Sequence, residues 1–275
     1  MPVPSYAMAV RKEIFGEGAE RIVSKLRYLD KNNCFKGPKL VAKESRHVLN
    51  KSQYGKQLKF HKTFMRTQAI ASEMATKFNN DIDALEDMYN NNSSWVKTVR
   101  SLPRIDFLEP YVTELWDDRG EAEYYLIEPF LEGRYTKFNS NNGFVQPGQD
   151  EESKSDFSGH DVIDIFSKMK KTSSGLGMIE ECDEIDDDEI SAQESLFDLK
   201  DEYFPQAFSH YTYAKSKKRL MVVDLQGVLD KKLDGRKSYN LTDPVIHKRN
   251  RHDAYTYSFG RTNRGDKVSA RRITQ

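Results

Sequence analysis

Cysteine is nearly absent from this sequence, and its scarcity excludes one class of protein at once. Cys34 and Cys182 are the two cysteines among 275 residues, and they lie far apart in unlike surroundings. A disulfide framework is therefore not expected, and the low count is compatible with a reducing compartment.

Long hydrophobic runs are lacking as well. No stretch reaches the roughly 18 consecutive apolar residues that a membrane span needs. The N-terminal sequence MPVPSYAMAVRKEIF has no apolar core of the kind found in a signal peptide. We therefore expect a cytoplasmic protein without a membrane partner.

A net charge is the third feature that the chain lacks. Lys plus Arg number 43 and Asp plus Glu also number 43, so no global field attracts nucleic acid or membrane, and we expect neither as a partner. The chain does have the apolar content of a folded protein, with 37% apolar and 11% aromatic residues. Its length suits one large domain or two modest ones, and any electrostatic function must be local.

The N-terminal part of the chain predicts a turn, a hairpin and a strand that carries a lysine. Gly16 and Gly18 bracket the turn, the apolar positions of 22–26 indicate a strand or a pair of strands, and the run KLVAK ends at Lys43. A two-glycine turn is common, and a lysine on a strand usually faces water. On its own, this segment favours an ordinary surface hairpin over a functional site.

Residues 54–79 follow a helical pattern, with apolar side chains that recur at helical spacing and no glycine or proline after Gly55. The pattern consists of Phe60, Phe64, Ala71, Met74, Ala75 and Phe78. Glu73 lies within the predicted helix, where the ordinary expectation is a solvated charge. A carboxylate on a helix that follows a lysine-bearing strand is also able to orient the lysine, so Glu73 remains a minor candidate.

A second hairpin is predicted further along the chain. The runs YVTELW (111–116) and YYLIEPF (124–130) flank the turn DDRGEAE, and the second run ends at Glu128 and Pro129. The polar loop EGRYTKFNSNNGFV follows. Such loops are mostly turns, although asparagine amides beside a lysine also suit contacts to phosphate or ribose.

Residues 148–200 break the composition of the chain. Eight of the ten residues in EECDEIDDDE (180–189) are acidic, which predicts a disordered surface insert that could dock a basic partner. A calcium loop is the alternative, but the segment lacks the alternating D-x-D-x-D-G ligands followed by a distal glutamate.

The most informative polar residues follow a buried strand. The run FPQAFSHYTY (204–213) predicts one strand, and Met221 to Val223 predict the end of another, after which come Asp224 and Gln226 and a release at Gly227. Residues i and i+2 of an extended segment point to the same side, so both side chains could meet one ion.

The polar residues together supply the parts that phosphoryl transfer requires. These parts are a cation for the phosphates, carboxylate and amide oxygens for Mg²⁺, a group that places the acceptor hydroxyl, and glycines that let the backbone approach the nucleotide. Lys43 is the cation, Asp224, Gln226 and Asp243 of NLTDP supply the oxygens, and FGRTNRGDK (259–267) supplies the glycines.

Several motifs occur in the order seen in the alpha-kinases, and the chain resembles that family over roughly residues 11–267. They are VAK at 41–43, LIEPF at 126–130, KFNSNNG at 137–143, PQAFSHYTY at 205–213, VVDLQGV at 222–228, LTDP at 241–244 and FGRTNRG at 259–265. These are the atypical serine/threonine protein kinases that include the myosin heavy chain kinases and elongation factor 2 kinase. PQAFSHYTY with VVDLQG and LTDP downstream is a highly specific combination.

The resemblance implies a nucleotide site in the N-terminal half. Lys43 is similar to the lysine that contacts the phosphates, and Gly18 with Arg21 is similar to the turn that covers them. The backbone from Glu128 to Phe130 resembles the hinge that holds adenine.

It also implies a catalytic site in the C-terminal half. Asp224 is similar to the catalytic aspartate of the family, and Gln226 and Asp243 are similar to its magnesium ligands. The turn from Gly260 to Gly265, with Asn263, resembles the glycine-rich loop that helps to place a peptide substrate. The cofactors implied are ATP and Mg²⁺.

Zinc is a further implication of the resemblance. His210 lies fourteen residues before Asp224, as the zinc-binding histidine of the family does, and the remaining ligands belong to a His-x-Cys-x-x-x-Cys segment after the glycine loop. This chain instead ends KVSARRITQ, without a cysteine after Cys182 and with His252 as its last histidine. That segment does not complete a tetrahedral site. A chain cut short, a misread final exon and a genuine zinc-free variant all fit this ending.

A second departure from the family is the stretch LDKKLDGRKSYN before Asp243, which is longer than the usual short turn. If it bulges outward, Asp243 still reaches the metal, and otherwise the ion loses a ligand.

We expect an α+β, two-lobed kinase-like fold with an incomplete C-terminal zinc module and with nucleotide in the cleft between the lobes. The expected bounds are 1–10 for an N-terminal extension, 11–128 for the small lobe and 129–275 for the large lobe, together an alpha-kinase domain at 11–275.

Two functions remain open. The first is an ATP- and Mg²⁺-dependent kinase acting on serine or threonine of a protein substrate, which the intact Lys43, Asp224, Gln226 and Asp243 favour. The second is a catalytically weak pseudokinase or interaction domain, which the missing zinc ligands and the acidic insert favour.

Overall fold

The structure is a computed structural model, and it describes residues 7–46, 54–88, 98–116, 120, 122–141, 200–249 and 259–265. The chain forms two compact units. The first unit draws on residues within 1–69, 108–132 and 258–260, and the second draws on the remainder. Separate sheets and helices confirm the α+β class, and the two units agree with an architecture of two lobes.

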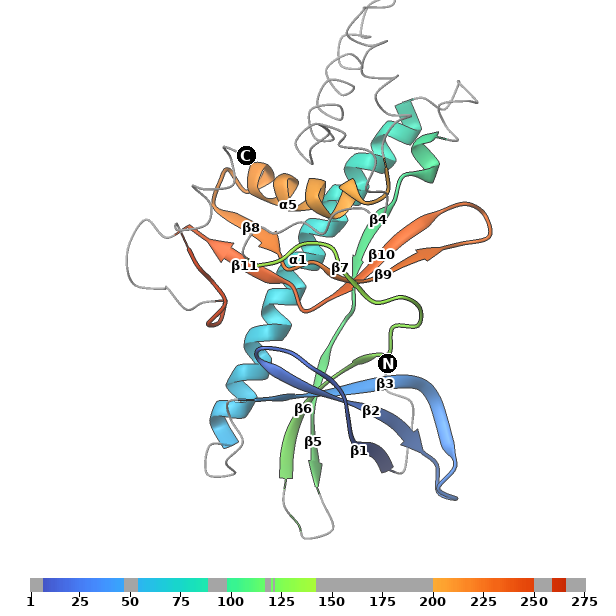
Figure 1. Cartoon of the computed structure of the whole chain (residues 1–275), viewed down its shortest axis with the longest axis vertical. Helices are drawn as coiled ribbons and strands as arrows, with labels where there is room; N and C mark the ends of the chain where they lie inside the picture. Colours follow the sequence, from blue (N-terminus) through green and yellow to red (C-terminus); the bar gives the residue numbers. More distant parts are fainter. Residues whose placement is uncertain are drawn as a thin grey trace, which may run out of the picture. The chain divides into compact units, whose positions relative to one another are not determined.

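The first unit is built on one antiparallel sheet of five strands in the order β1-β2-β3-β6-β5 (Figure 1). The strands are β1 (Ala7–Glu17), β2 (Arg21–Leu29), β3 (Phe35–Ser45), β5 (Tyr111–Trp116) and β6 (Ala122–Pro129). One face buries Leu26, Tyr28, Leu40, Ala42 and Ile127 as a core. Both predicted hairpins and the lysine-bearing strand are confirmed. Gly16 lies inside β1, so the turn begins later than expected, after Glu17.

Helix α1 (Tyr54–Met88) confirms the predicted helix and continues past Asn79. Its first half belongs to the first unit and its second half to the second unit. In the second half, the buried apolar positions recur with the helical period and are Ala71, Met74, Ala75, Phe78, Ile82 and Leu85. Glu73 is exposed and pairs with Lys77 one turn along the helix at 2.6 Å, so it is a solvated helix charge and not the partner of Lys43.

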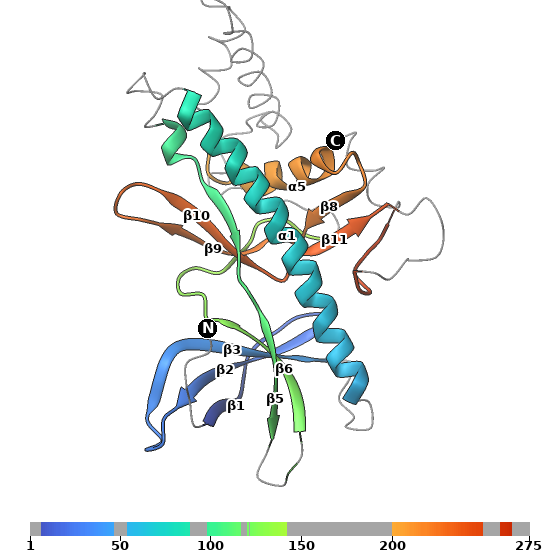
Figure 2. The ribbon, with the colours of Figure 1, turned by 180° about the vertical axis from the view of Figure 1, so that it is seen from behind.

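The second unit contains two small sheets. One has the order β4-β10-β9-β7, and the other pairs β11 with β8. The strands are β4 (Arg104–Phe107), β7 (Thr136–Lys137), β8 (Leu220–Val223), β9 (Gln226–Lys231), β10 (Lys237–Thr242) and β11 (Val245–Lys248). Strands β9 and β10 form an antiparallel hairpin, and β4 lies parallel to β10. The second half of α1 runs alongside β4 (Figure 2).

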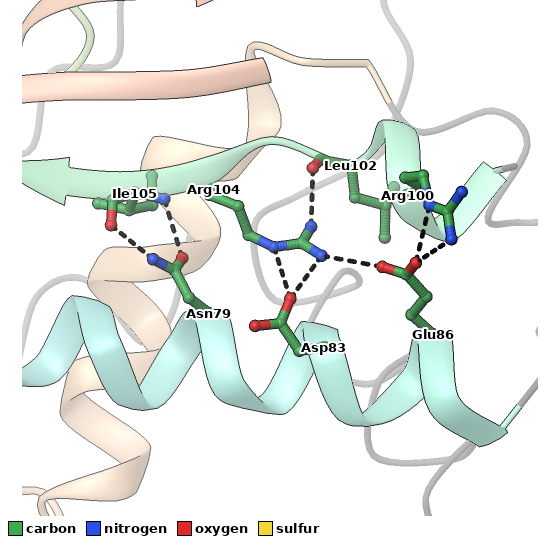
Figure 3. Close-up of polar contacts among 7 residues, drawn as sticks. All are labelled: Asn79, Asp83, Glu86, Arg100, Leu102, Arg104 and Ile105. Atoms are coloured by element: carbon green, nitrogen blue, oxygen red, sulfur yellow. Dashed lines mark hydrogen bonds and ion pairs between the residues drawn. The ribbon is translucent and has the colours of Figure 1, made fainter. Parts of the chain in front are cut away.

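A polar network fastens β4 to α1 (Figure 3). The Asn79 amide accepts a hydrogen bond from the Ile105 backbone nitrogen and donates one to the Ile105 carbonyl, both at 2.9 Å. Arg104 pairs with Asp83 at 2.7 Å, and Arg100 pairs with Glu86 at 2.6 Å. Because β10 is bonded to β4, these contacts also hold the strand that ends just before Asp243.

The segment PQAFSHYTY is a helix, and the prediction of a strand was wrong. Helix α5 spans Tyr203–Lys215. The aromatic content of the segment favours a strand, but its polar residues Gln206, Ser209 and Thr212 recur every three positions, which is a helical period. Phe208 and Tyr211 pack edge-on against Phe78 of α1, so burial against α1 stabilises the helix.

The predicted acidic insert lies outside the described residues apart from its last position, Lys200. Strand β1 begins at Ala7, within the stretch expected as an N-terminal extension, and the expected domain bounds stay predictions. Among the helices that the structure describes, none is long and apolar enough to cross a membrane.

Candidate active site

Two aspartates occupy matching kinks in the second unit. Asp224 follows β8 and precedes β9 with φ of 60°, and Asp243 follows β10 and precedes β11 with φ of 55°. The register pairs Val223 with Val245 on one side of the kinks and Gln226 with Thr242 on the other. The two kinks therefore lie opposite each other where both strand pairs pass from one sheet to the next. Left-handed backbone at non-glycine residues is unfavourable and concentrates at functional sites.

The kink corrects one prediction about Asp224 and Gln226. Their side chains were expected on one side of an extended segment, but the left-handed conformation of Asp224 interrupts that segment. Gln226 instead begins β9, opposite Lys137 of β7 and Thr242 of β10. Pairing between strands, and not alternation along one strand, therefore determines which residues lie beside Gln226.

The prediction that the strand ends with a release of the chain at Gly227 was wrong. Gly227 is the second residue of β9. Its φ is 155°, and a Cβ atom there would lie 2.0 Å from the carbonyl oxygen of Asn240. Glycine is required at this position because the backbones of β9 and β10 approach so closely beside the kinks.

The long stretch before Asp243 forms the end of the β9–β10 hairpin and its turn at Gly235. Since Thr242 returns to pair with Gln226, the extra residues project along the hairpin away from the kinks. Asp243 therefore reaches the same end of the hairpin as Asp224, whatever the length of the turn.

Asp224 is held by a lysine and a backbone amide from the loop after β6. Lys137 Nζ lies 2.6 Å from Asp224 Oδ1, and the Asn141 backbone nitrogen donates to the same oxygen at 3.2 Å. The Asp224 side chain is 16% exposed and the Lys137 side chain is 50% exposed. A cation and a backbone donor on the same oxygen hold this carboxylate in one orientation.

Asn139 fixes the backbone next to Asp224. Its Oδ1 accepts from the Leu225 backbone nitrogen at 2.9 Å, and its Nδ2 donates to Ser209 Oγ at 3.1 Å and to Gln206 Oε1 at 3.3 Å. Thr212 Oγ1 accepts from the Val222 backbone nitrogen at 3.0 Å. The polar face of α5 therefore positions strand β8, which ends just before Asp224.

Asn141 offers an oxygen that nothing in the described structure uses. Its Oδ1 is buried without a hydrogen-bond partner among the described residues, although its backbone nitrogen contacts Asp224. Oδ1 of Asp243 is buried as well. Carboxylate and amide oxygens are the donors that Mg²⁺ prefers, and a buried amide oxygen left without a donor is costly. The residues present therefore fit a magnesium ion.

The glycine-rich turn is tied to β11 of the second unit. Asn263 Oδ1 accepts from the backbone nitrogens of Lys248 and Gly265, at 3.1 and 3.0 Å. Gly265 has φ of 54° and Gly260 has φ of 83°, conformations that glycine adopts without strain. The Asn141 side chain donates to the Thr262 carbonyl at 3.4 Å, so the turn also meets the loop that contacts Asp224.

Lys43 forms a buried ion pair in the first unit. Its Nζ lies 2.6 Å from Glu128 Oε2, and the two side chains are 4% and 1% exposed. Gln68 of α1 donates to the other oxygen of Glu128 at 3.1 Å and to the Leu108 carbonyl at 2.6 Å. The carboxylate that orients the lysine therefore comes from the strand end predicted as the hinge, and not from Glu73.

The remaining predicted nucleotide residues also lie in the first unit. The Gly18 backbone nitrogen donates to the Arg21 carbonyl at 2.9 Å and closes the β1–β2 turn. The buried Arg21 guanidinium stacks on the Phe64 ring, 3.4 Å from its centroid. The Phe130 backbone nitrogen donates to the Lys39 carbonyl at 2.9 Å, and its ring packs against Phe15.

His210 lies on α5 and is partly buried. Within the part of the chain that the structure describes, no group of three or more histidine, cysteine or acidic side chains could hold a metal. Its predicted role as a zinc ligand stays a prediction.

Three residues of this site were missing from the sequence-based assignment: Lys137, Asn139 and Asn141. All three come from KFNSNNG, which was noted as an asparagine-rich loop beside a lysine. Their alternation at i, i+2 and i+4 is a usable signal, but which polar group meets Asp224 depends on a contact across 83 positions of the chain.

The fold and the motifs define a class, and comparisons with known proteins agree with it. The alpha-kinase domain of myosin-II heavy chain kinase A, solved as an inactive variant in complex with ATP, aligns with a TM-score of 0.54 and 22% identity, covering 97% of this chain and 83% of that one. The apoenzyme of the same domain aligns with a TM-score of 0.53. The architecture is thus that of an alpha-kinase catalytic domain.

The sequence leads to the same family. A model of the alpha-kinase family matches residues 16–167 and 190–271. Eukaryotic elongation factor 2 kinase of Rattus norvegicus is 28% identical over 144 residues, 52% of this chain and 12% of that protein. Alpha-protein kinase vwkA of Dictyostelium discoideum is 25% identical over 229 residues, 83% of this chain and 24% of that protein. The chain belongs to the alpha-kinase family, and it spans only a small part of these longer relatives.

Proposed function

We propose that this protein is an ATP- and Mg²⁺-dependent protein kinase that transfers the γ-phosphoryl group to serine or threonine of a protein substrate. The observation that carries the proposal is the pair of opposed, left-handed aspartates, Asp224 and Asp243, with Lys137 and the buried Asn141 oxygen beside them. Membership of the alpha-kinase family supports it.

The second unit supplies the groups for the acceptor and the metal. Asp224 accepts a hydrogen bond from the acceptor hydroxyl and takes its proton as the new P–O bond forms and the bond to the β-phosphate breaks. Lys137 stabilises negative charge next to that carboxylate. Oxygens of Gln226, Asp243 and Asn141 would hold Mg²⁺, which neutralises phosphate charge when bound.

The first unit supplies the groups for the nucleotide. Lys43 contacts the phosphates, and Glu128 keeps its ammonium group in a fixed position. Gly18 and Arg21 belong to the turn that covers the phosphates. The backbone from Glu128 to Phe130 holds the adenine. A cytoplasmic location accompanies this proposal as a prediction.

The test is transfer of ³²P from Mg²⁺ATP to a basic peptide that contains threonine. We expect Asp224→Ala to lower the rate by about 10³-fold. Asp230→Ala is the matched control, because Asp230 is an exposed carboxylate on the neighbouring strand β9 and should leave the rate unchanged.

Equal rates for wild type and Asp224→Ala would contradict the proposal. Binding of Mg²⁺ATP without transfer by the wild type would favour the alternative, a catalytically weak pseudokinase or interaction domain.

A further inference from the structure

His247 connects three parts of the second unit, and none of the assigned roles uses it. It lies on β11 opposite Met221 of β8, and it is 3% exposed. Its Nδ1 is 3.1 Å from the Arg264 backbone nitrogen, in the glycine-rich turn. Its Nε2 is 3.2 Å from the Asn141 carbonyl, in the loop that contacts Asp224.

The chemistry of these partners fixes the state of the ring. A backbone N–H only donates, so Nδ1 must accept and carries no proton. A carbonyl only accepts, so Nε2 must carry the proton and donate. One neutral tautomer satisfies both contacts, and each ring nitrogen holds a different loop.

Both loops lead to reacting groups. The backbone of Asn141 donates to Asp224, so the Nε2 contact stabilises the segment that orients the catalytic carboxylate. The backbone of Arg264 lies between Asn263 and Gly265, so the Nδ1 contact stabilises the turn assigned to the peptide substrate.

We propose that His247 is a positioning residue that holds the glycine-rich turn for the acceptor peptide through Nδ1 and the Asn141 loop for catalysis through Nε2. The proposal rests on the proposed kinase function. It separates two effects of one side chain: loss of the Nδ1 contact weakens peptide binding, and loss of the Nε2 contact slows the transfer step.

Two amide substitutions divide these contacts. In His247→Asn, Oδ1 stands near the place of Nδ1 and can accept from Arg264, but nothing reaches the Asn141 carbonyl. In His247→Gln, Nε2 stands near the ring Nε2 and can donate to that carbonyl, while the acceptor for Arg264 is lost. His247→Leu removes both contacts and keeps an apolar side chain in the core.

We expect the two amide variants to change different kinetic constants. His247→Gln should raise KM for the peptide by about tenfold with kcat nearly unchanged, because the part-buried Arg264 backbone donor loses its acceptor. His247→Asn should lower kcat by about tenfold with KM for the peptide nearly unchanged. His247→Leu should show both changes, and KM for ATP should stay within about twofold in all three.

Amide hydrogen exchange supplies a readout that does not depend on activity. Exchange at Arg264 should be faster in the Gln and Leu variants and close to wild type in the Asn variant. Ile246→Val, a change at the neighbouring buried position of β11, controls for altered packing and should leave both kinetic constants and the exchange rate unchanged.

Parallel loss of kcat and peptide affinity in the Asn and Gln variants would overturn the proposal, as would unchanged exchange at Arg264 in the Gln variant. If His247→Leu does not fold, the two amide variants alone decide whether the proposal holds, since they are expected to change different kinetic constants. A wild-type chain that transfers no phosphate would refute the proposed function instead, and exchange at Arg264 would still decide whether His247 holds the turn.

Discussion

The charged groups of the two units differ in how completely the protein satisfies them. In the first unit, Lys43 and Glu128 are buried together, and Gln68 bonds the second carboxylate oxygen. In the second unit, Asp224 remains partly exposed beside a half-exposed Lys137, and the nearby Asn141 oxygen is buried without a donor among the described residues.

The two units therefore differ in whether these polar groups find all of their partners within the described protein. A buried ion pair is stable only when its partners and hydrogen bonds are all present, so it fixes a geometry in advance. A buried amide oxygen without a donor is unfavourable, and a bound cation would offset that cost. The first unit presents a fixed lysine, and we propose that the second presents a site that a bound cation completes.

The largest effect on stability is expected when the buried ion pair between Lys43 and Glu128 is broken. Glu128→Ala should lower the free energy of unfolding by about 3–5 kcal/mol, because it removes the carboxylate that pairs with the buried Lys43 ammonium group. It should also abolish phosphotransfer. Urea denaturation measures the first effect and the ³²P assay measures the second.

An exposed pair of the same length is the matched control for that experiment. Lys39 and Glu132 also lie 2.6 Å apart, but their side chains are 60% and 68% exposed. Glu132→Ala should change stability little, because water and salt screen exposed pairs. The double variant Lys43→Met with Glu128→Leu should recover stability without activity, and recovery of both would contradict a functional role for Lys43.

The close approach of β9 and β10 gives the next largest effect. Gly227→Ala should destabilise the protein by about 3 kcal/mol, because its Cβ atom would overlap the Asn240 carbonyl at a strained φ. Gly235→Ala lies in the turn of the same hairpin, where no atom comes within 4 Å of the added Cβ. Only backbone strain applies there, so we expect about 1 kcal/mol. Equal losses, measured by thermal unfolding, would argue against the close approach.

Acid is expected to lower the folding stability of the first unit. His61 of α1 is fully buried, and its Nε2 donates to the Tyr124 carbonyl at 3.0 Å. Burial lowers its pKa from 6.5 to about 4, with a smaller contribution from Arg21 and an opposing one from the Tyr124 carbonyl. The unfolded chain therefore binds more protons between pH 4 and 6.5, and stability is complete above pH 6.5 and falls with pH through that window.

Between pH 6.5 and 5 the expected loss is about 2 kcal/mol. His61→Gln retains a donor for the Tyr124 carbonyl and does not titrate in this range, so its stability should depend less on pH. Urea midpoints at several pH values measure both proteins, and identical slopes would contradict the assignment to His61.

The smallest expected effect separates two asparagines of one loop. Asn141→Leu should weaken Mg²⁺-nucleotide binding by about tenfold in a calorimetric titration. It should cost little stability, because Oδ1 has no donor to lose among the described residues and Nδ2 loses a single long contact of 3.4 Å to the Thr262 carbonyl. Asn139→Leu should instead lower stability by about 2 kcal/mol, because it leaves the buried Leu225 backbone nitrogen without an acceptor. Unchanged metal-nucleotide binding in Asn141→Leu would remove Asn141 from the metal site.

Much of the fold could be predicted because local patterns were strong. The two hairpins of the first unit, the strand that carries Lys43 and the long helix α1 all matched their hydrophobic periods. Helix α5 was mistaken for a strand because aromatic content was weighted above the period of its polar residues. The reason for that period is visible only in the tertiary structure, where Ser209 and Gln206 accept hydrogen bonds from Asn139.

The sequence by itself determined the family, the chemical types at the site and the order of the motifs. Tertiary structure decided the partners. Glu128, and not Glu73, pairs with Lys43, and Lys137 pairs with Asp224. The strand register of the long β9–β10 hairpin places Asp243 in the kink opposite Asp224. The physical reason is that side-chain type and local period are encoded residue by residue. Which charged groups meet depends on strand register and helix packing between segments far apart in the chain.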